Sequence, residues 1–152
     1  MNRKPVGLME DFTKLSRLMH EGFISEFGPG DYPIKERNKK LYGIVSPNYD
    51  YTFSCPGMAW SYKEIAESKV PETYLVIGSG LEGIKTYLFG DWNTPIGIAR
   101  INKKFGMDLI QGFKQIGNDS EPFALDVNIE NQLPFLQFVS KDRIGDVSFV
   151  PL

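Results

Sequence analysis

Few side chains in this 152-residue chain are suited to nucleophilic catalysis or to binding a transition metal. The sequence holds one histidine, His20, and one cysteine, Cys55. A Ser-His-Asp or Cys-His arrangement would therefore have to use His20. Two such residues are also too few for a zinc site built from histidine and cysteine. We do not expect a conventional metalloenzyme, and His20 is better explained as a polar residue at the edge of a helix.

A second group of residues could line a site at the ends of the predicted strands, because ligands of open α/β sheets bind beyond the carboxyl ends of the strands. Carboxylates and amides there would suit a hard cation such as Mg²⁺ or Ca²⁺. Surface charges and helix caps give the same pattern, and no spacing in the sequence fixes a coordination sphere. The candidate residues are Asn48, Asp50, Tyr51, Leu81, Glu82, Asp126 and Glu130.

Residues 78–83 have the Gly-x-Gly-x-x-Gly spacing of a dinucleotide-binding loop. That motif should follow the first strand of a sheet and open a helix. Here it follows the second predicted strand, and residues 85–89 are typical of a strand or of irregular chain. Nucleotide binding is therefore an alternative that would require an anion seated on these backbone amides.

The hydrophobic pattern that must position these residues predicts a single α/β domain of three layers, with a mainly parallel central sheet flanked by helices. Residues 1–40 are expected to be an N-terminal helix and a charged connector, packed as one unit with 41–152. Strand 41–46, a helix and strand 73–77, expected to be buried on both faces, would form a right-handed βαβ unit. Helices are predicted at 9–27, 58–68 and 102–117, a hairpin turn near 91–97, and a last strand at 147–152.

Composition and charge exclude several classes of function. The net charge is −2 and the pI about 5.5, so no basic stripe is present to neutralise phosphates, and nucleic-acid binding is not expected. No apolar run approaches the roughly 20 residues of a membrane span. The N-terminus lacks the apolar core of a signal peptide. One cysteine cannot form an internal disulfide, which favours a cytoplasmic protein.

Four ordered blocks of the sequence, at 41–57, 73–83, 91–97 and 126–152, resemble the Memo family, known as protein B of the AmmeMemoRadiSam system. In the first block the family motif Pro-His-Ala-Gly-Tyr-x-Tyr-Ser-Gly-Pro corresponds to residues 47–56, where Pro47, Tyr51, Ser54 and Pro56 are kept. The third contains the Trp-x-Thr-Pro turn at 92–95, and the fourth the Ile-Glu-x-Gln-Leu-Pro-Phe-Leu-Gln run at 129–137. The resemblance implies an α/β fold related to class III extradiol dioxygenases, of which this chain would be one half.

This chain departs from the family at the residues that bind metal. The resemblance places two ligand histidines at Asn48 and Leu81, and a third active-site histidine at Val127. A later ligand cysteine lies in the half that has no counterpart here, and Cys55 aligns with a glycine. Amides and aliphatic side chains are poor ligands for iron or copper. The resemblance therefore implies a catalytically degenerate protein without a cofactor, acting as a binding or structural subunit. The alternative is an enzyme of altered chemistry that uses the carboxylates.

The last strand, Val-Ser-Phe-Val-Pro-Leu at 147–152, is apolar and carries no charge that would discourage pairing. If it lies at the edge of a half-length sheet, another chain must cover it. We expect a homodimer or a partner protein at this strand.

Overall fold

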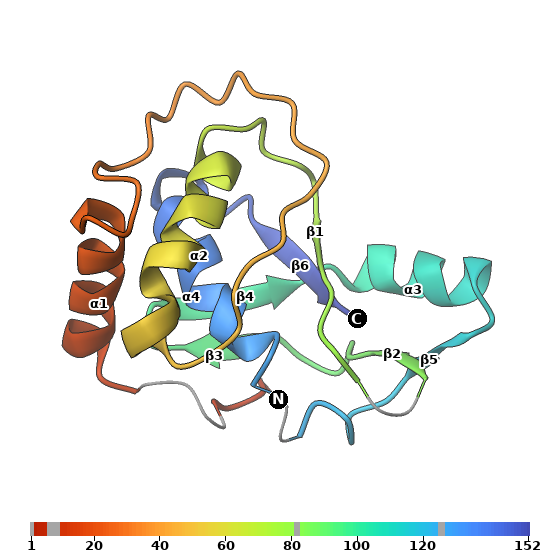
Figure 1. Cartoon of the computed structure of the whole chain (residues 1–152). Helices are drawn as coiled ribbons and strands as arrows, with labels where there is room; N and C mark the ends of the chain where they lie inside the picture. Colours follow the sequence, from red (N-terminus) through yellow and green to blue (C-terminus); the bar gives the residue numbers. More distant parts are fainter. Residues whose placement is uncertain (1, 6–9, 81–82, 125–126) are drawn as a thin grey trace.

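Four strands form the central sheet of the computed structural model, in the order β1-β6-β4-β3 (Figure 1). Strands β1, β6 and β4 are parallel to one another, and β3 pairs with β4 as an antiparallel hairpin. Strands β2 and β5 form a separate parallel pair. The structure describes residues 2–5, 10–80, 83–124 and 127–152. Its strands are Tyr74–Val76 (β1), Ile84–Thr86 (β2), Trp92–Thr94 (β3), Gly97–Ile101 (β4), Ile116–Asn118 (β5) and Ser148–Pro151 (β6).

Helices lie on both sides of this sheet. Helices α1, α2 and α4 gather on one side, and α3 lies on the other (Figure 1). The predicted α/β domain with a mainly parallel sheet flanked by helices is therefore confirmed. The helices are Phe12–Ile24 (α1), Tyr51–Ala66 (α2), Lys103–Gly112 (α3) and Leu133–Val139 (α4), with short 3₁₀ turns at Glu130–Gln132 (η1) and Lys141–Arg143 (η2).

The apolar core has two parts. One fills the space between α1, α2 and α4 and contains Phe23, Met58 and Phe135, all fully buried. The other lies around the hairpin and β6, where Trp92 packs edge-on against Phe149 with ring centroids 5.6 Å apart. Trp92 has no exposed surface, so it is a residue of this core.

The N-terminal cap of α3 was predictable from its residue type. Asn102 accepts a hydrogen bond from the amide of Phe105 at 3.0 Å, as an N-cap asparagine should. The helix is shorter than the predicted 102–117, because α3 ends at Gly112 and β5 begins at Ile116. Helix α1 is likewise shorter than 9–27, beginning after the capping residue Asp11.

The predicted strand at 41–46 is not formed. Residues 41–50 contain no helix or strand, and Tyr42 and Val45 are 90% and 95% exposed. Local contacts hold this segment to α2 instead: the Ser61 hydroxyl donates to the carbonyl of Val45 at 2.9 Å. The apolar pattern is that of a strand, but a strand also needs a neighbouring strand at hydrogen-bonding distance, and the described residues supply none for this segment. The predicted βαβ unit is therefore incomplete.

Helix α2 begins seven residues before the predicted start at Met58. Asp50 caps it by accepting a hydrogen bond from the amide of Thr52 at 2.8 Å. Pro56, which precedes the predicted helix 58–68, lies inside α2. A proline within a helix removes one hydrogen bond, which the buried contacts of this apolar helix offset. Residues 51–54 are consequently helix and not loop.

The last strand is not at an edge of the central sheet, whose edge strands are β1 and β3. Strand β6 lies between β1 and β4 and is largely buried, so the chain itself covers the strand that was expected to need a second copy. Leu75 and Ile77 are 42% and 71% exposed. The prediction that 73–77 is buried on both faces is therefore wrong, because the strand has a neighbour on one side only.

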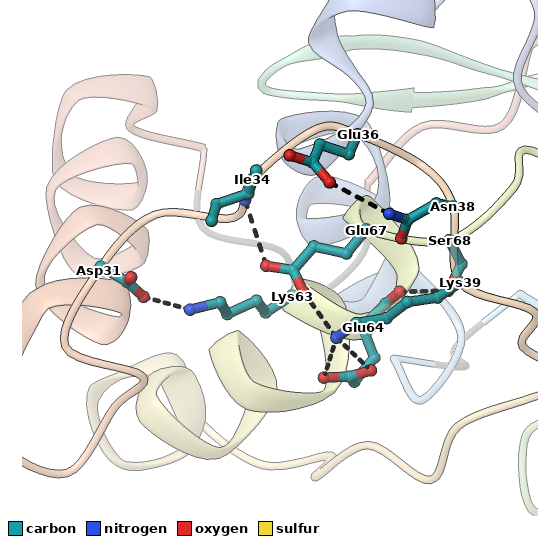
Figure 2. Close-up of polar contacts among 9 residues, drawn as sticks. All are labelled: Asp31, Ile34, Glu36, Asn38, Lys39, Lys63, Glu64, Glu67 and Ser68. Carbon is teal, nitrogen blue, oxygen red and sulfur yellow. Dashed lines mark hydrogen bonds and ion pairs between the residues drawn. The ribbon is translucent and has the colours of Figure 1, made fainter.

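Ion pairs fix the charged connector 31–40 against α2 (Figure 2). Lys39 pairs with Glu64 at 3.0 Å and with Glu67 at 2.6 Å, and Lys63 pairs with Asp31. The hydrogen bonds from Lys39 lower the pKa of Glu67. The connector is thus attached along its length, and it leads directly into segment 41–48.

Candidate functional site

A groove of about 660 Å³ lies between segment 41–48 and strand β1. One wall is residues 41–44 with Ser46 and Asn48, the other is residues 73–79, and the floor includes Tyr62, Gln132 and Leu136. Its volume is in the range of small-molecule sites. Among the described candidate residues, Asn48 lines this groove.

Amide side chains close one end of the groove. The Asn48 amide nitrogen donates to the side-chain oxygen of Asn128. The Asn128 nitrogen in turn lies 3.4 Å from the Ser79 hydroxyl. These residues come from three separate segments, so the end of the groove depends on the whole fold.

Gln132 joins the two walls through the floor. Its nitrogen donates to the carbonyl of Pro47 at 3.1 Å, and its oxygen accepts from the Tyr62 hydroxyl at 3.0 Å. Burial raises the pKa of Tyr62, so the phenol stays protonated and keeps donating. The neighbouring Tyr51 is also buried and donates to the carbonyl of Asn131 at 2.6 Å. Both tyrosines have structural partners.

The predicted carboxylates do not form an acid/base pair among the described residues. Asp50 caps α2, and hydrogen bonds from Thr52 lower the pKa of its carboxyl. Glu130 is fully buried and pairs with Arg3, whose guanidinium also lies 4.0 Å from the Trp92 ring. Leu81, Glu82 and Asp126, with part of the glycine-rich loop, lie outside the described residues.

The groove does not fit a transition metal. Its polar end consists of the amides of Asn48 and Asn128 and a serine hydroxyl, all neutral donors that are weak ligands for iron, copper or zinc. Across the described ranges, no group of three His, Cys, Asp or Glu residues could hold a metal ion. His20 bonds to Tyr32 beside α1, and Cys55 is buried, as expected for a small core residue. Burial raises the pKa of the Cys55 thiol to about 12.

The glycine-rich loop does not have the context of a phosphate-binding loop. Gly78 donates its amide to the carbonyl of Leu152 at 2.9 Å, which continues the pairing of β1 with β6. After the loop the chain enters β2, which begins at Ile84, and not a helix. The helix N-terminus that would face a phosphate is therefore missing at this position.

Polar residues of the groove that were not selected from the sequence include Ser79, Asn128, Gln132 and Lys69. Asn128 and Gln132 lie in the fourth block of family resemblance, so that block was the available signal. Lys69 follows a helix and has no motif around it. It is the one charged residue among those described that line the groove.

Comparison with known proteins identifies the family. The model of the family "Memo-like protein" matches residues 8–152. The chain belongs to the Memo family. Relatives include MEMO1 family proteins of Methanopyrus kandleri (37% identical over 147 residues, 93% of this chain and 51% of the relative), Thermotoga petrophila (32% over 131 residues, 82% and 46%) and Nitrosopumilus maritimus (30% over 151 residues, 94% and 54%).

The chain spans about half the length of these curated Memo relatives. The match begins near α1 and runs through β6, so every helix and the central sheet belong to the matched region. No helix in the described part of this Memo chain has the length and hydrophobicity needed to cross a membrane.

Proposed function

We propose that this Memo-family chain works by binding a ligand in the groove between segment 41–48 and β1, and not by metal-dependent catalysis. The observation that supports this most is the hydrogen bond between Asn48 and Asn128 at the polar end of the groove. In the resemblance described above, position 48 holds a metal-ligand histidine. Here it holds an amide whose nitrogen bonds a second amide.

The rest of the groove supports binding through shape and neutral hydrogen bonding. Both walls carry apolar side chains, among them Tyr42, Ile44 and Val76, and the polar end offers amides and a hydroxyl. Sites of this kind bury the apolar part of a ligand and orient it with a few polar contacts. The alternative, an enzyme that uses Asp50 and Glu130, is less favoured because both carboxylates already serve as a cap and an ion-pair partner.

The first test is metal content. We expect elemental analysis of the purified protein to give no stoichiometric metal, and a thermal-shift scan with Mg²⁺, Ca²⁺, Mn²⁺, Fe²⁺, Cu²⁺ and Zn²⁺ to give no stabilisation. Stoichiometric metal that disappears in Asn48→Ala or Asn128→Ala, with Asn38→Ala as the exposed control, would overturn the proposal.

The second test is occupancy of the groove. A library of neutral fragments that carry an amide or an alcohol is added to ¹⁵N-labelled protein. We expect hits that move the side-chain amide signals of Asn48, Asn128 and Gln132, while those of Asn118 stay unchanged. Fragments that bind only elsewhere, or none that bind, would contradict a ligand site in the groove.

A further inference from the structure

Two kinds of surface in this fold could accept a second copy of the chain, an open sheet edge or an apolar helix face. At the β3 edge the N-terminal arm adds a bridge, since the amide of Asn93 donates to the carbonyl of Arg3 at 2.8 Å. At the β1 edge the described residues supply no further strand, but the backbone groups of Leu75 and Ile77 face the groove, because the alternate positions pair with β6. Segment 41–48 stands across that groove, so neither edge is a flat surface open to another molecule.

Helix α2 has no polar side along most of its length. Residues 51–62 contain no charged side chain. A helix that is apolar all round is normally enclosed on every side. Helices α1 and α4 pack against α2 (Figure 1), yet Phe53 and Trp60 remain 76% and 53% exposed. The outer side of α2 is therefore an apolar surface that the described part of the chain leaves open.

The exposed residues of α2 form one continuous stripe. Phe53 and Trp60 lie seven residues apart and so on the same side of the helix, with Pro56 and Gly57 between them. The ring nitrogen of Trp60 donates to the carbonyl of Phe27 at 3.1 Å, which sets the exposed Phe27 beside the stripe. No charged side chain interrupts this line of residues.

Segment 41–48 and the residue after it widen the stripe on its other side. The Ser61 hydroxyl holds Val45, which is exposed and does not line the groove. The ring of the exposed Tyr49 lies with its centroid 6.2 Å from that of Phe53. We call this surface the α2 patch; it consists of Phe27, Val45, Tyr49, Phe53 and Trp60.

The α2 patch is large enough for a stable interface. Its four aromatic side chains, at roughly 150–250 Å² each, leave about 500 Å² of surface exposed. The largest apolar patch on a monomer is typically about 300–600 Å² and is often functional. With its rim, the α2 patch approaches the roughly 800 Å² that each partner buries in a standard interface. Its composition, aromatic and without charge, is that of an interface centre.

The patch is complementary to itself in one orientation. Positions 53 and 60 are equally far from the middle of the stripe at 56–57. Two α2 helices that cross there in antiparallel orientation therefore place each Phe53 against the Trp60 of the second copy, as an isologous interface requires. A parallel crossing would bring the two Asp50 carboxylates together, whereas the antiparallel crossing keeps these like charges at opposite ends.

We propose that two copies of the chain associate through the α2 patch as an antiparallel, two-fold symmetric dimer. The sequence suggested a second copy at the last strand, which the chain itself covers; the surface that a second copy covers is instead the outer side of α2. The residues of the α2 patch do not line the groove, so the dimer does not depend on the proposed function.

The first test is the mass of the full chain in solution, measured by analytical ultracentrifugation over a range of micromolar concentrations. We expect about twice the 17.2 kDa of one chain. Phe53→Glu should raise the dimer dissociation constant at least about tenfold, because it buries a carboxylate at the centre of the interface. Phe113→Glu, at a 57% exposed phenylalanine after α3, is the matched control and should leave the constant unchanged. Circular dichroism verifies that both variants fold.

A single-chain mass at every concentration would overturn the proposal and leave the α2 patch to a different protein. A dimer that persists in Phe53→Glu, or that is lost equally in Phe113→Glu, would overturn this interface.

The second test is a charge swap that reports the orientation. Phe53→Glu and Trp60→Lys should each be monomeric alone. An equimolar mixture should form a heterodimer, because the antiparallel crossing sets the new glutamate of one chain against the new lysine of the other. The same contact should weaken when the salt concentration is raised. A mixture that stays monomeric would overturn the antiparallel arrangement.

Discussion

The buried ion pair of Arg3 and Glu130 is the residue-scale feature with the largest expected effect on stability. Glu130 has no exposed surface, and Arg3 also donates to the carbonyl of Phe123 at 2.9 Å. Arg3 therefore ties the N-terminal arm to the turn before α4. Removing one member of a buried pair leaves a desolvated charge without its counterion, which is far more costly than removing both.

We expect Arg3→Met to lower the free energy of unfolding by about 3–5 kcal/mol. The double variant Arg3→Met/Glu130→Leu should lose less than the single variant, because no buried charge then remains. Urea denaturation followed by circular dichroism measures both. A double variant less stable than Arg3→Met would contradict this account.

At the scale of elements, the crossing of α1 and α2 depends on a glycine. A Cβ atom placed on Gly22 would lie 2.9 Å from the backbone oxygen of Cys55, so the helices could not keep this distance. We expect Gly22→Ala to lower the unfolding free energy by about 1–3 kcal/mol through overpacking. The control is Gly112→Ala at the end of α3, where a Cβ meets nothing within 4 Å. A fall of equal size in both variants would show that the close approach is not the cause.

The connector and η2 are linked by an ion-pair cluster that should respond to acid. Hydrogen bonds from Lys35 and Arg37 lower the pKa of Asp142 from 3.8 to about 2. A carboxyl with a lowered folded-state pKa stabilises the fold above its unfolded pKa, and this contribution is lost as the pH falls through the folded value. Its size is at most about 1 kcal/mol, because the Asp142 side chain is 42% exposed.

We expect Asp142→Asn to be slightly less stable than the original chain at pH 7, with the difference disappearing between pH 4 and pH 2. Chemical denaturation at a series of pH values tests this. Glu121→Gln, an exposed carboxylate outside the cluster, is the control. A difference that stays constant down to pH 2 would exclude a contribution from the charge of Asp142.

At the scale of the whole molecule, the asymmetry of the sheet edges should be visible in amide hydrogen exchange. We expect the amides of Leu75 and Ile77 to exchange more than about tenfold faster than those of Gly78 and Asn93, which are hydrogen-bonded. Residue-resolved exchange by NMR measures all four. Slow exchange at Leu75 and Ile77 in the free chain would mean that the β1 edge is already covered.

Much of this architecture could be predicted from sequence because its signals are local. Asn102 caps a helix through its own side chain, the turn 94–97 is compact, and Pro134 starts a helix at its first turn. Segment 41–46 could not be predicted in this way. Its residues have the pattern of a strand, but pairing depends on how far connector 31–40 is held from β1, which is a property of distant contacts.

The same distinction applies to the groove. Asn48 was selected because it occupies a motif position beside a predicted strand. Only folding brings the other polar residues of the groove near Asn48, because they are distant from it in the sequence. Asn128, Gln132 and Lys69 lie 80, 84 and 21 residues after Asn48. The pairing of Arg3 with Glu130 leaves no pattern in the sequence, so a structural carboxylate such as Glu130 could not be distinguished there from a functional one.

The shielded position of Cys55 makes the chain convenient for chemical labelling. Its sulfur is buried between α1 and α2 and holds its proton at neutral pH, so thiol reagents should leave the folded protein unmodified. A cysteine introduced at the exposed Tyr42 would then be the sole reactive thiol, without any change to the core. A fluorophore or spin label at that position could report movements of segment 41–48 relative to β1, with no other residue of the chain changed.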